Sequence, residues 1–577
     1  MSAFFLVPTK NSPLISEAER VFEKRGIRGG RHFTLSCGEL LLYPKQMLDV
    51  ENFKANDKGS IFCIGTPVYK GLSYDESQKQ MLDDFQQGKL QTELLLGEYV
   101  LIFDVGGCVS VLTDATGMYK LFTDLDSRFV TSSFMAAAAC TAHTINHLAV
   151  AEQMLYGFVG APDTLVNEVI CLKNPKERVS VSWIQWLGHE QHPNLKRSKT
   201  KAESIKRQHD AISEYLKGVR ALVHEFGGEC GMSGGNDSRL VYASVNAACE
   251  PLKSVHTHCT SNVHNKEINV VKKVVGILGT PLNMVPTTYI SDCDGDTINE
   301  TLRENVMYFD ARNAENIGAF SQTHTQWYKK AAANGNGVTF SGIAGEIYRD
   351  FYHTKVPRFG FNRWLESRVF AKGIKSMIPC GLYDGAMRRI TEKVQTETGL
   401  DLQKKTNPIV SKRFFDCYRI PNALSNVVHA NNQMSFYLAP FTESMLIRTA
   451  KPDGCWHEHC GEYEGKITTA FMPNVAAIPG SNGYPLSDVP YKDLLKWYML
   501  SRLPFALWDK KTKSDKGNPS NAKRLEQVLE KSSYLQSAMK CFNFIFPDWN
   551  MDSATRGDVL LNNYIFTICA VYEITML

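Results

Sequence analysis

The sequence predicts an α/β protein made of three successive parts, and three observations support this class. The first part, about 190 residues long, is rich in short strand patterns separated by glycine turns. From about residue 228 to about residue 340, strand patterns alternate with helical patterns, as is typical of a parallel sheet. From about residue 355 to the end, most segments have helical periodicity.

The strand-rich part contains a clear hairpin signal. Residues 98–103 and 108–112 are apolar runs on either side of a turn that carries Gly106 and Gly107. Residues 60–65 and 129–131 predict further strands. We place the boundary after this part, so that residues 1–195 form one domain and residues 196–577 form another.

The middle part predicts strands at 254–257, 282–285 and 338–340. A helical pattern of apolar residues runs from Ile268 to Leu278 and stops at Gly279. Near the end of the chain, Leu561, Tyr564, Ile565, Ile568 and Cys569 recur at helical spacing and predict a helix that packs on the body of the protein.

Bulk composition indicates a folded protein without a membrane or nucleic-acid partner. Of the 577 residues, 43% are hydrophobic and 21% are charged, as in ordinary globular domains. The net charge of +4 is spread along the chain, whereas nucleic-acid binding usually needs a concentrated basic patch. Fifteen scattered cysteines and no secretory signal predict free thiols and a cytoplasmic protein.

Residues 233–238, Ser-Gly-Gly-Asn-Asp-Ser, predict a phosphate-binding loop. They lie between a short small-residue run and the apolar start of a helix. Glycines let the main chain approach an anion, and the N–H groups and dipole at a helix start favour negative charge. Asp237 adds a carboxylate that can hold Mg²⁺ against the same phosphates. No Gly-Lys-Ser/Thr follows, so this is not the lysine-containing P-loop.

A second loop follows the strand at 338–340. Ser341 and Gly342 come directly after this strand, as Ser233 and Gly234 come after theirs. Ligands of parallel α/β sheets bind at the carboxyl ends of the strands. We therefore expect Ser341 and Gly342 to lie beside the phosphate loop.

These motifs resemble those of the asparagine synthetase family, which includes β-lactam synthetases and lasso-peptide macrolactam cyclases. The resemblance rests on 97–104, on the Ser-Gly-Gly-Asn-Asp-Ser loop, on Phe-Ser-Gly-Ile-Ala-Gly-Glu at 340–346 and on the helical signature at 430–443. It implies an N-terminal glutaminase-like α/β/β/α sandwich. A parallel-sheet ATP pyrophosphatase domain with a helical C-terminal part would follow it.

The resemblance also implies a reaction. Such enzymes use ATP and Mg²⁺ to adenylate a carboxylate, release pyrophosphate and transfer the acyl group to an amine. Ser233, Gly234, Gly235, Asp237, Ser238, Ser341 and Gly342 are the expected nucleotide-binding residues. Asp237 and Asp310 are the expected Mg²⁺ ligands. Tyr308 and Glu346 are the candidate bases, and Lys466 is the candidate lysine near ATP.

The chain departs from the glutamine-hydrolysing members at its second residue. Those enzymes need a cysteine there, and this chain has Ser2. We therefore predict no glutaminase activity. The predicted partners are a carboxylate-bearing small molecule or peptide and an amine, and a homodimer is possible. A peptide macrolactam and a small amide both remain open as products.

Three alternatives remain beside this interpretation. The protein is a catalytically degenerate scaffold, or its ATP chemistry serves another acceptor such as tRNA. The residues Cys455, His457, His459 and Cys460 also suggest zinc, but they fall within six positions, whereas zinc sites usually draw pairs from separate segments. Failure to bind ATP would favour the scaffold.

Overall fold

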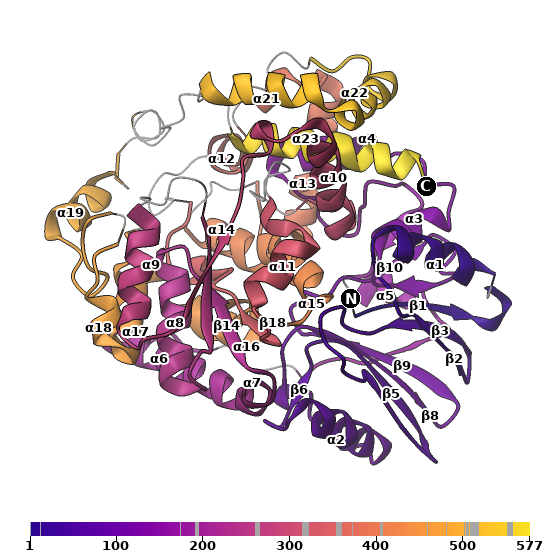
Figure 1. Ribbon diagram of the computed structural model, residues 1–577, viewed down its shortest axis with the longest axis horizontal. Helices are drawn as coiled ribbons and strands as arrows, with labels where there is room; N and C mark the ends of the chain where they lie inside the picture. Colours follow the sequence, from indigo (N-terminus) through magenta and orange to yellow (C-terminus); the bar gives the residue numbers. More distant parts are fainter. Residues whose placement is uncertain are drawn as a thin grey trace.

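The computed structural model describes the chain except for residues 1, 12, 174, 191–194, 260–265, 314–321, 353–359, 372, 404–407, 458–459, 481, 501, 504–506, 508–518 and 551–557. It is a mixed α/β structure with antiparallel sheets near the N-terminus and a parallel sheet in the middle of the chain (Figure 1). The predicted class is confirmed at this level.

Two sheets form the strand-rich part. The first has the order β12 (Val169–Cys171), β10 (Phe122–Asp124), β11 (Val130–Thr131), β1 (Ala3–Pro8), β3 (Gly38–Tyr43), β2 (Arg31–Leu35). The second has the order β13 (Gln185–Trp186), β9 (Cys108–Thr113), β8 (Tyr99–Val105), β5 (Gly59–Gly65), β4 (Phe53–Asn56). The predicted hairpin is β8–β9, and both turn glycines have positive φ. A short sheet of β6 (Val68–Tyr69) and β7 (Leu95–Leu96) lies apart.

Alternation along the strands builds a helix–sheet–sheet–helix stack. Phe4 and Leu6 of β1 share an apolar core with Ile102 of β8, and this core lies between the sheets. The alternate β1 residues pack with α1 (Leu14–Lys24) and α3 (Phe134–Ala139). On the other side, Leu101 and Phe103 pack with α2 (Tyr74–Gln86). The period of two along a strand directs successive side chains to these separate cores.

The middle of the chain forms a five-stranded sheet in which every pairing is parallel. Its order is β16 (Leu282–Pro286), β15 (Ser254–Cys259), β14 (Gly228–Gly231), β17 (Val338–Phe340), β18 (Phe436–Leu438). The chain adds β15 and β16 on one side of β14, and then β17 and β18 on the other. The boundary between β14 and β17 is therefore the point at which the strand order reverses, where ligands of such sheets bind.

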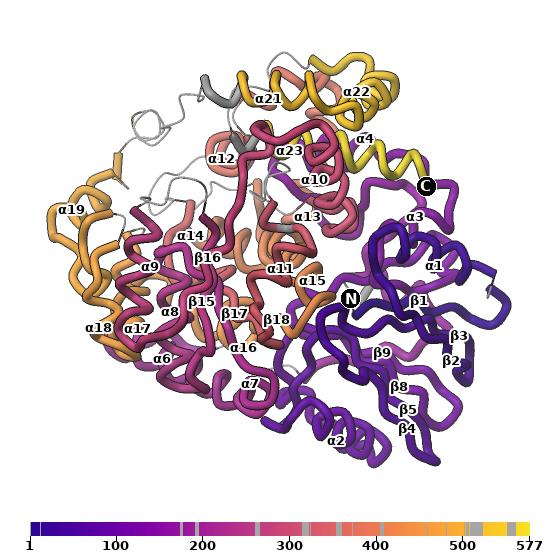
Figure 2. Tube along the Cα trace, in the orientation of Figure 1, coloured from indigo at the N-terminus to yellow at the C-terminus, as the bar shows by residue number. Residues whose placement is uncertain are grey.

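Helices surround this sheet and make up most of the later chain (Figure 2). A π-helical segment, Phe414–Leu424, contains Pro421, which has no N–H to donate. The other α-helices are α4 (His147–Tyr156), α5 (Pro175–Val179), α6 (Lys201–Gly218), α7 (Arg220–Phe226), α8 (Asn236–Ala248), α9 (Lys266–Gly276), α10 (Gly295–Tyr308), α11 (Gln326–Ala333), α12 (Phe361–Arg368), α13 (Cys380–Thr398), α14 (Pro408–Arg413), α15 (Ser425–Asn432), α16 (Ser444–Ala450), α17 (Glu462–Phe471), α18 (Pro473–Ala476), α19 (Tyr491–Leu500), α21 (Pro519–Lys531), α22 (Ser533–Ile545) and α23 (Asp558–Thr575).

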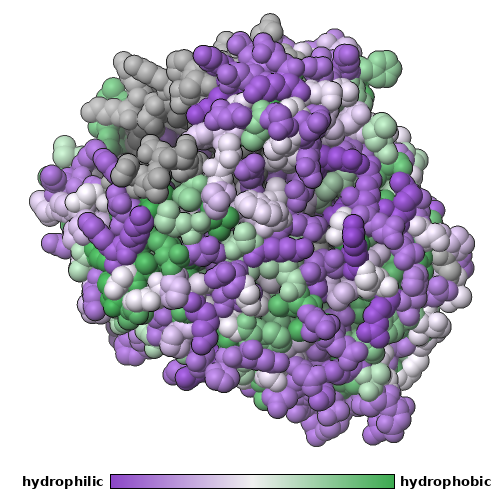
Figure 3. Space-filling view, viewed as in Figure 1, coloured by the Kyte–Doolittle hydropathy of each residue, from purple (hydrophilic) through white to green (hydrophobic). Residues whose placement is uncertain are grey.

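The predicted C-terminal helix is α23, and it lies beside α4 and α10 (Figure 1). Its end returns to the N-terminal part, where Lys24 pairs with Glu573 at 3.1 Å. The face in Figure 3 is mainly hydrophilic with small apolar areas. Among the described residues, no helix combines the length and apolar character needed to span a membrane.

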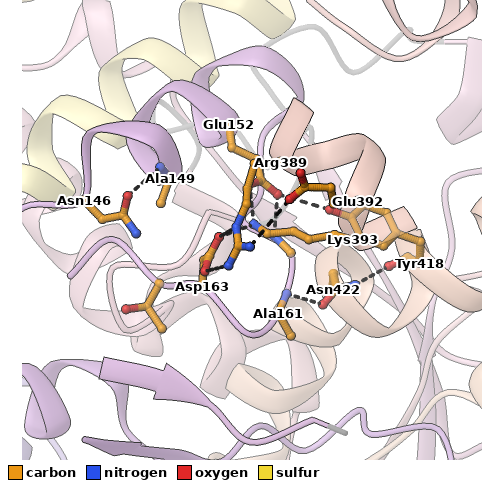
Figure 4. Close-up of polar contacts among 12 residues, drawn as sticks. Asn146, Ala149, Glu152, Ala161, Asp163, Arg389, Glu392, Lys393, Tyr418 and Asn422 are labelled. Carbon is orange, nitrogen blue, oxygen red and sulfur yellow. Dashed lines mark hydrogen bonds and ion pairs between the residues drawn. The ribbon is translucent and has the colours of Figure 1, made fainter. Parts of the chain in front are cut away.

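A buried ionic network joins α4 to α13 (Figure 4). Lys393 donates to Glu152 Oε2 at 2.5 Å and also pairs with Asp163 at 2.9 Å. Both Glu152 and Lys393 are almost fully buried. Tyr156 and Tyr418 donate to Glu152 Oε1, so both carboxylate oxygens have partners.

Glu98 is buried where the N-terminal part meets the segment after β18. Thr442 donates to Glu98 Oε1 at 2.9 Å, whereas Glu98 Oε2 accepts no hydrogen bond from the described residues. Burial raises the pKa of Glu98 to about 8, from an ordinary value of 4.5. In the folded protein the carboxyl group of Glu98 is therefore mainly protonated at neutral pH.

We expect Glu98 to make stability fall with rising pH. Because its pKa is higher in the folded state, its favourable contribution is complete below about pH 4.5 and is lost as pH rises through about 8. Replacing Glu98 with Gln should flatten the slope of unfolding free energy by up to about 1.4 kcal/mol per pH unit. Urea denaturation across this range measures the slope, with exposed Glu51→Gln as control. Equal slopes for wild type and Glu98→Gln would contradict the expectation.

Candidate functional site

The 233–238 loop lies where the sequence predicts, between β14 and α8. Gly234 has a φ of +77°, which favours glycine, and Gly235 is the N-cap of α8. Ser233 and Gly235 are exposed, while Ser238 is buried in the first turn of the helix. The exposed main chain at this helix start has the features of an anion cradle.

The second loop packs directly on the first. A Cβ built at Gly342 would lie 2.9 Å from the carbonyl carbon of Asp237 and 2.9 Å from the nitrogen of Ser238. Ser341 N donates to Leu438 O at 2.9 Å, which holds this loop against β18. Only a residue without a side chain fits between the two loops without a backbone shift.

Both loops line one cavity of about 430 Å³. Ser233, Asp237, Ser238, Ser341 and Gly342 all contribute to its wall. The structure thus brings together five of the seven residues predicted to bind nucleotide, and it does so at the strand-order reversal. The volume lies within the usual range of small-molecule sites.

We expect Gly342→Ala to disturb this cavity. The added methyl group meets backbone atoms of Asp237 and Ser238, so the loops must separate. A displacement of this kind should weaken nucleotide binding by at least about tenfold. Calorimetric titration with ATP measures it, and Gly276→Ala, which has open space around it at the end of α9, is the control. Unchanged ATP affinity in Gly342→Ala would show that the loop contact does not shape the site.

A histidine–glutamate pair lies on the β15 side of the cavity. His256 Nδ1 is 2.6 Å from Glu229 Oε2, and His256, His258 and Tyr328 line the cavity. Burial lowers the pKa of His258. Nothing in the sequence indicated the contact between His256 and Glu229.

Three carboxylates converge on Arg349, which follows the second loop. Its Nη2 lies 2.7 Å from Asp237 Oδ2 and 3.2 Å from Glu346 Oε1, and its Nη1 lies 3.3 Å from Glu464 Oε2. Burial opposes the charge on Arg349, but the three carboxylates outweigh it and raise its pKa. Burial and the charge of Asp237 raise the pKa of both Glu346 and Glu464. Three carboxyl groups therefore share one arginine, and without a further cation Glu346 and Glu464 are shifted toward their protonated forms.

This cluster is the part of the site that suits a divalent cation. Among the described residues, no group of three or more His, Cys, Asp or Glu is arranged to hold a metal ion. Mg²⁺, however, commonly takes only one or two protein carboxylates and completes its shell with phosphate oxygens and water. Asp237 and Glu346 fit that role, because both lie against the same cationic nitrogen and Asp237 Oδ1 accepts no hydrogen bond within the described chain.

Asp310 lies in a different setting from the one predicted. Its carboxylate is buried, pairs with Arg25 at 3.2 Å, and accepts hydrogen bonds from Ser133 Oγ and from Phe134 and Met135 N–H groups. It thus caps α3 of the N-terminal part. These partners occupy both carboxylate oxygens of Asp310. The prediction that Asp310 binds Mg²⁺ is therefore corrected: its carboxylate has a structural role at α3.

Tyr308 and Lys466 also lie outside the wall of the loop cavity. Tyr308 donates to Asn431 Oδ1 at 3.0 Å, and burial raises its pKa well above the ordinary value, so it stays protonated and is no base near neutral pH. Lys466 Nζ donates to Ser487 O at 3.0 Å. Glu346 is the candidate base that remains next to the loop.

Arg239 is buried and donates to Gly235 O and Ile478 O, so it supports the loop from below. Of the four residues that suggested zinc, His459 lies outside the described residues. The cluster around Arg349 had one local signal, the one-turn spacing of Glu346 and Arg349, and Glu464 had none.

Comparisons with known proteins add little to this geometry. No protein-family model matches the chain, and a search of curated proteins finds no match. Among solved structures, the chain is similar to glutamine phosphoribosylpyrophosphate amidotransferase from B. subtilis in complex with ADP and GMP, at 12% identity and a TM-score of 0.21, over 40% of this chain and 60% of that one. A structure described as the allosteric regulatory enzyme of purine biosynthesis is similar at 10% identity and a TM-score of 0.23, over 50% and 80%. Similarity this low assigns no function to the chain.

Proposed function

We propose that the protein is an ATP- and Mg²⁺-dependent enzyme that adenylates a carboxylate and transfers it to an amine. The observation that carries this proposal is the meeting of two Ser-Gly loops around one cavity at the strand-order reversal. The resemblance of these loops to those of asparagine synthetases supplies the reaction class.

The proposed reaction has two steps. An oxygen of the substrate carboxylate attacks the α-phosphorus of ATP, and the bond to the β-phosphate oxygen breaks to release pyrophosphate. The amine nitrogen then attacks the acyl carbon, the bond between that carbon and the phosphate oxygen breaks to release AMP, and the amine proton passes to water. The products are an amide, AMP and pyrophosphate.

Each part of the site has a role in this proposal. The main chain of 233–238 and the hydroxyl groups of Ser233 and Ser341 bind the leaving pyrophosphate. Asp237 and Glu346 hold Mg²⁺, which neutralises phosphate charge when bound. Arg349 lies against both carboxylates and balances part of their charge. Ser2 is buried, with its hydroxyl accepting from Gly65 N, so we propose that the amine arrives without glutamine hydrolysis.

A catalytically degenerate scaffold is the second candidate. The positions of Tyr308 and Asp310, both engaged in structural contacts, favour it.

Pyrophosphate release from Mg·ATP in the presence of candidate acids and amines separates the two. Substrate-dependent release of AMP and pyrophosphate supports the enzyme. No release under any pairing supports the scaffold, and the absence of ATP binding as well excludes the enzyme.

A further inference from the structure

A second, larger cavity lies beyond the carboxylate cluster. Its volume is about 980 Å³, more than twice that of the loop cavity. Glu346 and Arg349 form part of its wall, and Arg349 also contacts Asp237 of the loop. One arginine thus separates the two cavities.

The wall of this cavity is rich in cations. Among its described residues are seven lysines and arginines and four carboxylates. Some cations are already paired, because Lys173 contacts Glu397 and Lys412 contacts Asp416, each at 2.5 Å. These pairs need no ligand to balance them.

Four of the seven cations form no ion pair with any described residue. Arg413 instead donates to Thr398 O at 3.0 Å, and the other three are Arg197, Arg448 and Lys451. Arg448 Nε is buried and lacks a hydrogen-bond partner among the described residues, which is costly unless a ligand supplies one. Arg197 stacks over Trp456 at 5.3 Å, which leaves the edge of its guanidinium group available. Phe351 and Phe415 add an apolar wall.

We propose that this cavity binds the substrate of the adenylation reaction, and that the substrate carries at least two further carboxylates beside the one that reacts. The reacting carboxylate lies at the Glu346–Arg349 end, next to the loop cavity. Arg448, Lys451 and Arg197 hold the others. The inference rests on the proposed function for the reaction and on the unpaired cations for the substrate class.

The size and walls of the cavity define this class further. Its volume is at the upper end for small-molecule sites. The substrate is therefore either a compact polycarboxylate that fills part of the cavity or an acidic peptide segment that fills more of it. The two share the carboxylate chemistry, and binding experiments distinguish them.

Calorimetry without ATP tests the proposal. The probes are propane-1,2,3-tricarboxylate, with propanoate as its monocarboxylate control, and hexaglutamate, with hexaglutamine as its neutral control. We expect one of the acidic probes to bind, more weakly with added salt, and its control to bind at least about tenfold more weakly. The double variant Arg448→Gln/Lys451→Gln should lose at least about tenfold in affinity for that probe. Lys79→Gln, on the exposed face of α2, should lose none.

The outcomes separate this inference from the proposed function. Binding of the tricarboxylate alone supports a small substrate, and binding of hexaglutamate alone supports a peptide. The inference is overturned if the wild type binds neither acidic probe. It is also overturned if the Arg448→Gln/Lys451→Gln variant binds the acidic probe as tightly as the wild type does. ATP titration of the same proteins is the second readout. If the wild type does not bind ATP, the proposed function is refuted even where the acidic probe binds. If the variant still binds ATP, its site is folded.

Discussion

Replacing Lys393 with Met should lower the free energy of unfolding by about 3–5 kcal/mol. The substitution keeps most of the side-chain volume but removes the only cation within hydrogen-bond distance of Glu152 among the described residues. Glu152 is almost fully buried, so its charge would remain without compensation. Asp163 keeps Arg389, with contacts of 2.7 and 2.8 Å, and is affected less. Chemical denaturation of both proteins measures the change.

Two further variants test whether charge is the cause. Lys375→Met removes a cation from an exposed pair with Glu366, and should change stability by about 1 kcal/mol at most. The double variant Lys393→Met/Glu152→Gln removes both charges and should be more stable than Lys393→Met alone. A Lys393→Met protein within about 1 kcal/mol of wild type would show that the network in Figure 4 contributes little.

The substitution Asp237→Asn should reduce pyrophosphate release by about 10²–10³-fold. The amide keeps the size of the carboxylate but binds Mg²⁺ poorly and no longer attracts Arg349. Glu346 and Glu464 would still surround Arg349, so the fold should persist. Measured rates over a range of Mg²⁺ concentrations should show a higher Mg²⁺ requirement in the variant.

The matched control for this prediction is Asp210→Asn. Asp210 pairs with Lys206 on the exposed face of α6, away from both cavities. Its rate and Mg²⁺ requirement should equal those of the wild type. Full activity in Asp237→Asn would show that Asp237 has no role in the reaction.

Short sequence patterns were sufficient to predict the two loops of the site, because the strands and helices next to them depend on neighbouring residues in the chain. The strand at Val338–Phe340 and the helix start after residue 235 follow from short apolar runs and glycine positions, and both loops follow from them. Alternation of strands and helices predicted the parallel sheet, and with it the edge at which the loops meet. The spacing of residues in the chain was sufficient for these features.

Contacts between distant segments were not predictable from one sequence. Asp310 has the right chemistry for Mg²⁺, but its partner Ser133 lies 177 residues away in the chain. Glu464 joins Asp237 and Glu346 only because α17 packs against α8. The spacing of these residues along the chain does not indicate which face of α17 packs against α8.

Exchange of labelled pyrophosphate into ATP tests the central claim most directly, because it reports reversible cleavage between the α- and β-phosphates before any amine is known. The account predicts exchange that requires Mg²⁺ and an acidic substrate, and that falls by about 10²–10³-fold in Asp237→Asn. Cleavage of ATP to ADP and phosphate instead, or exchange that persists undiminished in Asp237→Asn, would contradict it.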